Sequence, residues 1–163
     1  MRYCSECGAR LGYKAMEGRR RAYCPRCGKV FYEQLKVGAG CLVEREGRLL
    51  LLRRARAPFE GKWNLPAGYV EIDEEPSETA VRETEEETGL QVEVGELVGL
   101  YFFDDDPRGN GLLIVYRCKV VGGEMRETAE GREGTFFSRE ALPDDLAGGG
   151  HDRAIREWGE ASE

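Results

Sequence analysis

The stretch Gly68–Leu90, GYVEIDEEPSETAVRETEEETGL, decides how the rest of the chain is interpreted. It opens with a turn signal, passes through Pro76 and continues through good helix formers. It closes with Gly89, a residue type that commonly ends a helix in the left-handed conformation. We therefore predict a loop followed by a helix over residues 76–88.

Three glutamates share one face of this predicted helix. A helix turns by roughly 100° per residue, so Glu83, Glu86 and Glu87 project together beside a less polar sector that contains Ala80 and Thr84. Like charges three and four positions apart destabilise a helix, and a hard divalent cation relieves that repulsion because it prefers oxygen ligands. The pattern predicts a site for Mg²⁺ or Mn²⁺, with a solvated acidic helix as the plainer alternative.

The same stretch resembles the signature box of the Nudix hydrolases. Gly68 is followed, at the spacing of that box, by Glu74 and then by the run RETEEETGL over residues 82–90. Thr84 departs from the box, where the family usually has an aliphatic residue. The resemblance implies an α/β protein with a Nudix α/β/α sandwich and a mixed β-sheet. It also implies metal-dependent hydrolysis of the pyrophosphate bond in a nucleoside diphosphate derivative.

The resemblance further implies roles for individual residues. The metal ligands would be Ala67, through its backbone carbonyl, and Glu83, Glu86 and Glu87. Arg82 would orient these carboxylates, and Glu74 would brace the loop against the helix. An acid from the late part of the chain would assist catalysis, and Glu133 is our first choice and Glu130 our second. Solvated surface charge is the alternative for both.

Substrate contacts are expected from two further segments. The run over residues 91–103 ends in aromatic residues, which indicates a strand that delivers rings to the edge of a cleft. We take Tyr101 and Phe103 as candidate substrate-binding residues, with core packing as the alternative, and add Arg54 at the end of a predicted strand over residues 48–54.

The segment LPAGYVE, Leu65–Glu71, is similar to Nudix members that cleave compounds such as ADP-ribose. The array SQPWPFP that marks the NADH pyrophosphatases after the box is absent from this chain. ADP-ribose, FAD or a nucleotide sugar is therefore preferred as the substrate. NADH and NAD-capped RNA remain alternatives.

Two C-x-x-C-G motifs lie near the N-terminus. Cys4 and Cys7 form the first and Cys24 and Cys27 form the second, with sixteen residues between the two Cys-x-x-Cys turns. Four thiolates at this spacing can surround a tetrahedral Zn²⁺, whereas a disulfide pair or a thioredoxin-like redox site is the alternative. About thirty residues bury too little core to fold unaided, so we predict a structural zinc. We expect a zinc ribbon over residues 1–33 and a Nudix hydrolase domain over residues 34–163.

Composition restricts the partners. The chain has 163 residues and a net charge of −7, which argues against a general polyanion-binding surface. A phosphate ester would therefore be neutralised locally, by metal ions and a few arginines. No segment approaches the roughly 18 consecutive apolar residues of a membrane span, and cysteines stand where a signal peptide needs an apolar run. We expect a cytoplasmic protein that acts on a small-molecule nucleotide, with no membrane contact.

A different class of function remains open for the N-terminal segment. The triplet Arg19–Arg21, with Tyr13 and Tyr23 nearby, would favour a nucleotide-sensing or RNA-binding module, because basic residues beside aromatic rings can hold a strand. RNA is the less favoured partner, since a pure binder has no need for the catalytic set. Formation of a homodimer through the ribbon is a third interpretation that the sequence leaves open.

Three remaining residues are interpreted as structural. Cys41 and Cys118 each lie in an apolar, strand-like run, and we take both as buried core residues. The spacing of the six cysteines argues against a disulfide framework. His151 is the only histidine and follows three glycines, and we interpret it as structural or helix-capping.

Overall fold

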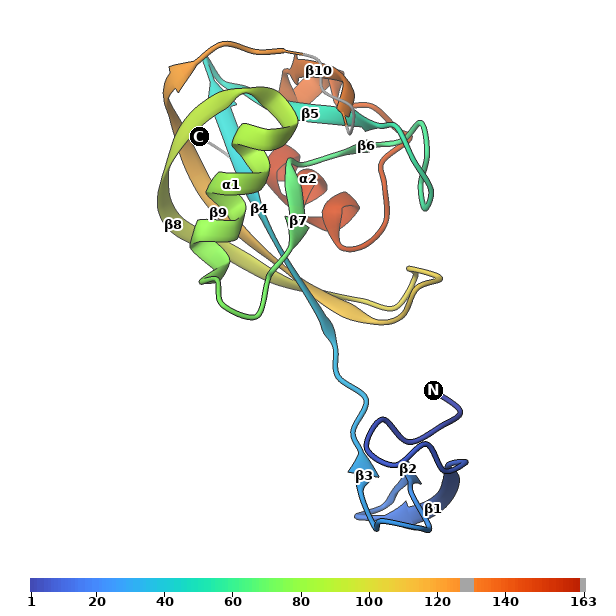
Figure 1. Cartoon of the computed structure of the whole chain (residues 1–163). Coiled ribbons are helices and arrows are strands. Elements are labelled where there is room, and N and C mark those ends of the chain that lie inside the picture. The colour runs from blue at the N-terminus through green and yellow to red at the C-terminus, as the bar shows by residue number, and fades with distance from the viewer. Residues whose placement is uncertain (127–130, 162–163) are drawn as a thin grey trace. The chain divides into compact units, whose positions relative to one another are not determined.

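The computed structural model describes residues 1–126 and 131–161. The chain divides into two compact units, Met1–Gln34 and Leu35–Glu163 (Figure 1). The division falls one residue after the boundary expected from the sequence. Each unit has its own sheet, and the two are described separately below.

The smaller unit is a three-stranded antiparallel sheet in the order β1-β2-β3. Its strands are β1 (Gly12–Met16), β2 (Arg19–Tyr23) and β3 (Val30–Phe31). Glu17 and Gly18 form the turn between the first two strands, and both have positive φ angles, of 51° and 73°. This backbone matches the twist of a two-residue hairpin, so the sequence Glu-Gly closes β1 onto β2 directly.

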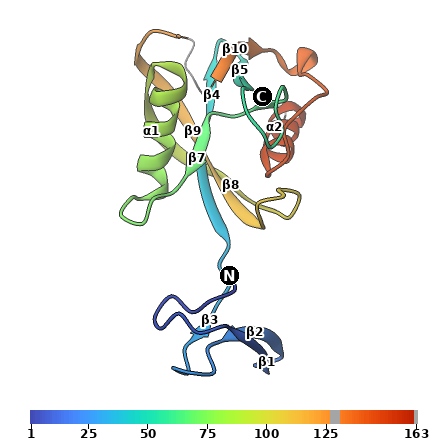
Figure 2. The ribbon, with the colours of Figure 1, turned by 45° about the vertical axis from the view of Figure 1, so that its right-hand side comes forward.

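The larger unit contains a seven-stranded mixed sheet in which β10-β5-β4-β9-β8 are neighbours, β6 pairs with β5 and β7 pairs with β4. The strands are β4 (Lys36–Arg45), β5 (Arg48–Arg54), β6 (Trp63–Asn64), β7 (Ala67–Tyr69), β8 (Leu90–Phe103), β9 (Gly111–Gly123) and β10 (Gly131–Phe137). The strands β4 and β9 run parallel, and the other pairs are antiparallel. Helix α1 (Pro76–Thr88) and helix α2 (His151–Glu160) cover opposite faces of the sheet (Figure 2), and a short 3₁₀ helix spans Arg139–Ala141.

Two apolar clusters lie on the two faces of this sheet. Successive side chains of a strand point to opposite faces, so the run of leucines in β5 serves both clusters. Leu49 and Leu51 pack with Ile155 of α2, while Leu50 and Leu52 belong to the cluster that contains α1. This arrangement confirms the predicted α/β/α sandwich and explains why β5 is apolar at four consecutive positions.

Helix α1 has the bounds predicted from the sequence. Gly89 adopts the left-handed conformation with φ 77° and ends the helix, and its N–H donates to the carbonyl of Glu85 at 2.8 Å. Thr84 is fully buried, and its hydroxyl donates to the carbonyl of Ala80 at 2.7 Å. Because the helix itself satisfies this hydroxyl, a polar side chain can occupy a position where the family usually has an aliphatic one.

The structure corrects one interpretation of the sequence. Cys41 and Cys118 are buried, as expected, but they also form a disulfide, with their Cα atoms 5.6 Å apart. The two residues are separated by 77 positions and become neighbours only because β4 pairs in parallel with β9. The spacing of cysteines in the sequence therefore carried no sign of this bond.

Helix α2 begins directly after Gly150, whose φ of 86° is in the left-handed region. Trp158 packs into the cluster on its face of the sheet. Among residues 1–126 and 131–161, we find no helix with the length and apolar character needed to cross a bilayer.

Candidate active site

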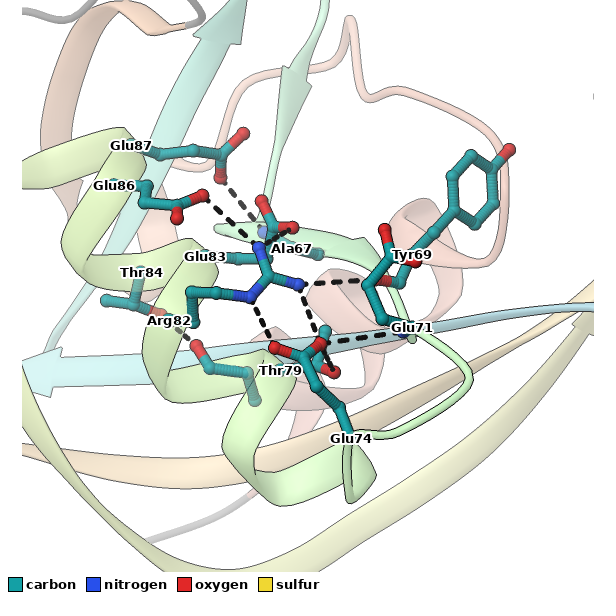
Figure 3. Close-up of polar contacts among 11 residues, drawn as sticks. Ala67, Tyr69, Glu71, Glu74, Thr79, Arg82, Glu83, Thr84, Glu86 and Glu87 are labelled. Carbon is teal, nitrogen blue, oxygen red and sulfur yellow. Dashed lines mark hydrogen bonds and ion pairs between the residues drawn. The ribbon is translucent and has the colours of Figure 1, made fainter.

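Arg82 lies at the centre of a group of carboxylates on α1 and the loop before it (Figure 3). Its Nη1 donates to Glu83 at 2.6 Å and to Glu86 at 3.2 Å. Its Nε and Nη2 donate to the two carboxylate oxygens of Glu74 at 2.6 and 2.9 Å. One guanidinium therefore fixes the orientation of three carboxylates, which is the task that the family resemblance implied for this residue.

Glu74 anchors this arrangement from the loop. Besides its two bonds to Arg82, its carboxylate accepts a hydrogen bond from the hydroxyl of Thr79 at 2.8 Å. The hydrogen bonds from Arg82 and then Thr79 lower the pKa of Glu74 to about 2, and the bond with Glu74 is the main reason that the pKa of Arg82 is raised. Both groups therefore stay charged throughout the neutral range, and the loop is held to the helix by an ion pair.

Two close contacts hold α1 against strand β7. Glu87 accepts a hydrogen bond from the backbone N–H of Ala67 at 3.0 Å. Gly68 lies under the carboxylate of Glu83, and a Cβ at this position would come within 2.1 Å of the Glu83 Cδ atom. A side chain at this position would force the carboxylate of Glu83, which Arg82 holds, to move, so the first glycine of the signature stretch makes room for the approach of a carboxylate.

The side chains at this site fit a hard divalent ion. Glu83, Glu86 and Glu87 offer carboxylate oxygens, which are the ligands that Mg²⁺ prefers, and the contact at Gly68 keeps Glu83 close to the backbone of β7. In the part of the chain that the structure describes, only the four cysteines near the N-terminus bring three or more ligand atoms within 4.8 Å of one another. The glutamates are instead spread around Arg82.

A cavity, which we call the carboxylate cavity, lies between this helix and the end of β5. Its lining residues are Leu52, Arg53, Arg54, Ala55, Arg56, Ala57, Asn64, Ala67, Gly68, Tyr69, Glu83, Glu87 and Arg108. Two carboxylates and four guanidinium groups thus line the same space. Burial lowers the pKa of Arg54, and the charge of Glu87 acts in the opposite direction.

A second cavity, which we call the His151 cavity, adjoins the first. Its lining residues are Gly38, Arg54, Phe59, Ala67, Gly68, Tyr69, Phe103, Asp106, Arg108, Leu113, Gly148, Gly149 and His151. Five of these residues also line the carboxylate cavity, namely Arg54, Ala67, Gly68, Tyr69 and Arg108. The two cavities therefore share a wall, and this wall carries two guanidinium groups.

The structure places the three predicted substrate-binding residues differently. Arg54 lines both cavities, and Phe103 lines the His151 cavity. Tyr101 is instead turned into the core, where its hydroxyl donates to Glu157 at 2.7 Å. Burial, followed by this hydrogen bond, raises the pKa of Tyr101 to about 12. A substrate contact for Tyr101 stays a prediction that this placement does not favour.

The late acids are placed only in part. Glu133 on β10 lies opposite Arg53 in the sheet, and its carboxylate is 3.8 Å from that guanidinium. It does not appear among the described residues that line the carboxylate cavity, although Arg53 does. Glu130, our second choice, lies outside the described residues.

The sequence did not indicate Arg108 as a site residue. Its guanidinium is held by the buried carboxylate of Asp106, with Nη2 donating at 2.7 Å and Nε at 3.0 Å, and this bond raises the pKa of Arg108. From the sequence, the polar and turn-rich loop over residues 104–111 is either a specificity loop or a solvated connection, and nothing in its composition says that one arginine lines a cavity. The one indication of this bond in the sequence is the order Asp-Pro-Arg, because Asp106 can bind the side chain that lies two residues later in the chain.

The N-terminal cysteines form a compact sulfur cluster in the smaller unit. The Sγ atoms of Cys4 and Cys27 are 3.6 Å apart and those of Cys7 and Cys24 are 3.4 Å apart. A tetrahedral zinc with Zn–S bonds of about 2.3 Å gives sulfur separations of about 3.8 Å, so the cluster fits this ion. The backbone N–H of Cys27 donates to the Sγ of Cys24 and is the main reason that the pKa of Cys24 is lowered to about 6. The predicted zinc ribbon is confirmed.

Comparison with known proteins agrees with these features. The NUDIX domain family matches residues 34–158, and a zinc-ribbon family described as Nudix N-terminal matches residues 2–33. The crystal structure of a Nudix hydrolase from Nitrosomonas europaea superposes with a TM-score of 0.86 at 33% identity, covering 98% of this chain and 91% of the other.

Two curated relatives carry names that state an activity. An ADP-ribose pyrophosphatase of Methanocaldococcus jannaschii is 41% identical over 103 residues, which cover 63% of this chain and 61% of that protein. An NAD-capped RNA hydrolase of Pseudomonas aeruginosa is 32% identical over 143 residues, which cover 87% of this chain and 49% of that protein. The chain thus spans about half to six tenths of the length of these relatives. From its family match, its fold and its carboxylate helix, the chain belongs to the Nudix hydrolase family.

Proposed function

We propose that this protein hydrolyses the pyrophosphate linkage of a nucleoside diphosphate derivative, with ADP-ribose as the preferred substrate and FAD or a nucleotide sugar next. The observation that carries this proposal is the carboxylate cavity. Glu83 and Glu87 line it together with Arg53, Arg54 and Arg108. A diphosphate between them would meet guanidinium groups directly and carboxylates through a bound cation.

The residues of α1 would hold the ion, as the family resemblance implies. Glu83, Glu86 and Glu87 supply carboxylates, and the backbone carbonyl of Ala67 is the further proposed ligand. When bound, Mg²⁺ or Mn²⁺ would neutralise the diphosphate and activate water. Arg82 acts on these carboxylates and not on the substrate, since its described bonds join it to the glutamates and to the backbone of the loop.

The arginines of the shared wall would hold the diphosphate oxygens. Nε of Arg54 donates to the carbonyl of Pro58 at 3.0 Å, and Nη2 of Arg108 donates to the carboxylate of Asp106. Both guanidinium groups are thus fixed in place before substrate binds, which lowers the entropy that is lost on binding.

A carboxylate must also accept the proton of the attacking water. Glu133 is our choice for this base, because the register of β10 against β5 fixes it beside Arg53, which lines the carboxylate cavity. If Glu133 has this role, Glu133→Gln lowers kcat while leaving KM nearly unchanged.

The names of the two curated relatives indicate different substrates, ADP-ribose for one and NAD-capped RNA for the other. The ADP-ribose pyrophosphatase is more similar in sequence, whereas the alignment with the NAD-capped RNA hydrolase covers more of this chain. We prefer ADP-ribose because the array expected of NADH pyrophosphatases is absent after the signature stretch. NADH and NAD-capped RNA remain the alternative substrates of the same reaction.

The direct test is turnover of a substrate panel. The purified protein is incubated with Mg²⁺ or Mn²⁺ and ADP-ribose, FAD, NADH, nucleotide sugars or nucleoside triphosphates, and every product is identified by mass. We expect AMP and ribose 5-phosphate from ADP-ribose. No hydrolysis of any pyrophosphate compound, with either ion, would contradict the proposed function.

A pair of variants on the same helix connects the activity to the carboxylates. Glu86→Gln should lower kcat by more than about 100-fold, because even the outer partners of metal ligands are worth about 10- to 100-fold. Glu85→Gln is the matched control, since Glu85 is exposed like Glu86 but is not among the carboxylates to which Arg82 donates in the described contacts. A near-normal rate in Glu86→Gln would remove that residue from the proposed metal site.

The ribbon supports a second candidate function, the binding of single-stranded RNA. Residues 1–34 contain eight basic and three acidic side chains, a net charge of +5. Arg20 lies over the exposed ring of Tyr13 at 4.4 Å, and Lys14 lies over Tyr23 at 4.7 Å. Such pairs offer charge for phosphates and ring faces for bases.

Titration of a fluorescent single-stranded RNA tests this second candidate. Binding should weaken steeply with salt and should fall in Arg20→Glu, whereas hydrolysis of ADP-ribose should not change. Equal affinity of the wild type and Arg20→Glu would remove this face of the ribbon as an RNA site.

A further inference from the structure

His151 is a buried polar group that the proposed chemistry does not use. It is the first residue of α2, it is only 9% exposed, and it lines the cavity named after it. Its Nδ1 atom has no hydrogen-bond partner among the described residues. A buried polar atom without a partner is unfavourable, and such atoms in native proteins call for an explanation.

The imidazole is neutral in this environment. Burial, and secondly the charge of Arg54, lower the pKa of His151 to about 3. A neutral imidazole has one nitrogen that donates and one that accepts, so it can recognise an uncharged ligand edge but adds no attraction for phosphate. The group at Nδ1 is thus suited to a neutral polar partner from outside the chain.

The other walls of the cavity favour a flat and largely apolar ligand. Phe59, Phe103 and Tyr69 supply aromatic side chains. The two charged residues of the loop that line this cavity, Asp106 and Arg108, are bonded to each other. A sugar would place several hydroxyls in this space with few free partners, whereas a nucleobase needs ring contacts on its faces and one or two polar contacts at its edge.

The position of the cavity agrees with this ligand. It shares Arg54 and Arg108 with the carboxylate cavity, so a base bound in it would be joined through its ribose to a diphosphate held at the shared wall. The wall behind it is fixed, because the N–H of Gly149 donates to Asp105 at 3.0 Å and a Cβ on Gly148 would meet that carboxylate at 1.9 Å.

We infer that the His151 cavity receives the nucleobase of the substrate and that Nδ1 of His151 makes a hydrogen bond with the edge of that base. This inference rests on the proposed function, and it assigns base specificity to a residue that lies outside the signature stretch. The expected ligand is an uncharged heterocycle, with adenine as the base of the preferred substrate.

Binding without turnover gives the first test. Calorimetric titration with AMP, IMP and CMP, in the absence of a divalent ion, should show a preference for one base of about 10-fold, the worth of one hydrogen bond. His151→Phe keeps a flat ring of similar size and should remove this preference, whereas His151→Asn keeps a polar atom at the δ position and should retain part of it. Equal preference in the wild type and His151→Phe, or no preference in the wild type, would overturn the inference.

Turnover and stability give the second test. In His151→Phe the kcat/KM for ADP-ribose, relative to its analogue with hypoxanthine, should move toward 1 through KM, with kcat nearly unchanged. A purely structural role would instead lower the melting temperature and leave this ratio as it is, which would also overturn the inference. If His151→Phe does not fold, the ratio of kcat/KM for the two substrates is compared between the wild type and His151→Asn instead, and this comparison decides.

The two proposals fail in different ways. If the monophosphates bind with a base preference that depends on His151 but no pyrophosphate is cleaved, the inference stands and the proposed reaction is wrong. If ADP-ribose is cleaved and the variants keep the wild-type base ratio, the reaction stands and the inference is wrong.

Discussion

The two units of this chain are stabilised by different means. In residues 1–34, Cys4 and Cys24 are the only residues in full burial, and apolar side chains such as Leu11, Val30 and Phe31 are only partly buried. The larger unit has two apolar clusters, one on each face of its sheet. The comparison predicts that the ribbon needs a metal ion at its sulfur cluster to fold, whereas the larger unit depends on hydrophobic burial.

The two units also carry opposite charges. The ribbon has a net charge of +5, and the remainder of the chain, with 16 basic and 28 acidic side chains, has a net charge of −12. The overall charge of −7 therefore conceals a basic segment. The positive potential around the ribbon suits it to a polyanion, while the acidic unit can admit a diphosphate only at a local cluster of arginines.

Loss of the zinc site should have the largest effect. Structural zinc contributes about 10–16 kcal/mol to small domains, far more than a ribbon of this size gains from burial. Cys24→Ser should therefore unfold the ribbon and leave the larger unit folded and active on ADP-ribose. Amide NMR spectra measure both outcomes, since the signals of residues 1–34 should collapse to random-coil shifts while those of the larger unit stay dispersed.

Tryptophan fluorescence provides the control for that experiment. Trp63 and Trp158 both belong to the larger unit, so their unfolding transition reports on that unit alone. Chelation of zinc from the wild type should reproduce the spectrum of Cys24→Ser without moving this transition. If the midpoint of this tryptophan transition changes when zinc is removed, the two units fold together. That result would contradict the claim that they are stabilised by different means.

The disulfide of the larger unit should have the next largest effect. A bond that closes a loop of 77 residues restricts the unfolded chain and contributes about 4 kcal/mol in the loop-entropy account. Reduction should therefore lower the urea midpoint of the tryptophan transition in the wild type. The double variant Cys41→Ala/Cys118→Ala should have a lower urea midpoint than the oxidised wild type. Addition of the reductant should not change this midpoint. An equal shift of the urea midpoint in the wild type and in the double variant would show that the reductant acts through the ribbon thiols and not through this disulfide.

The ion pair of Glu74 should have the smallest effect, and it is specific to acid. The folded-state pKa of about 2 lies below the ordinary value of 4.5, so Glu74 stabilises the fold above pH 4.5 and loses this contribution as the pH falls toward 2. The stability difference between the wild type and Glu74→Gln should therefore shrink over that window. Urea titrations followed by tryptophan fluorescence at pH 6, 4.5, 3 and 2 measure it. Glu71→Gln, an exposed neighbour, should show no such trend.

Local patterns predicted the elements well. The bounds of α1 follow from Pro76 at its start and Gly89 at its end, and the bounds of β5 follow from a leucine run between charged residues. The two cysteine motifs indicated the zinc ribbon because all four ligands lie in short turns of fixed geometry. Each of these features is determined by residues that are close in the sequence.

Contacts between distant segments could not be predicted in this way. The Cys41–Cys118 bond depends on the register of two parallel strands. The His151 cavity combines loops more than forty residues apart, such as those of Phe103 and Gly149. Tyr101 and Phe103 have the same spacing as two rings on one strand face and lie in the same core cluster, yet only Phe103 also lines the cavity, while Tyr101 is bonded to Glu157 of α2. No local pattern carries this information.

The disulfide also affects how the protein can be handled. The four ribbon cysteines need reducing conditions to remain thiolates, and Cys27 among them is exposed. A reductant that keeps these thiols reduced also attacks the disulfide between Cys41 and Cys118, which the larger unit shields almost fully from solvent. The rate of opening of the sheet, and not the strength of the reductant, should therefore set how long a preparation keeps both its zinc thiolates and its cross-link.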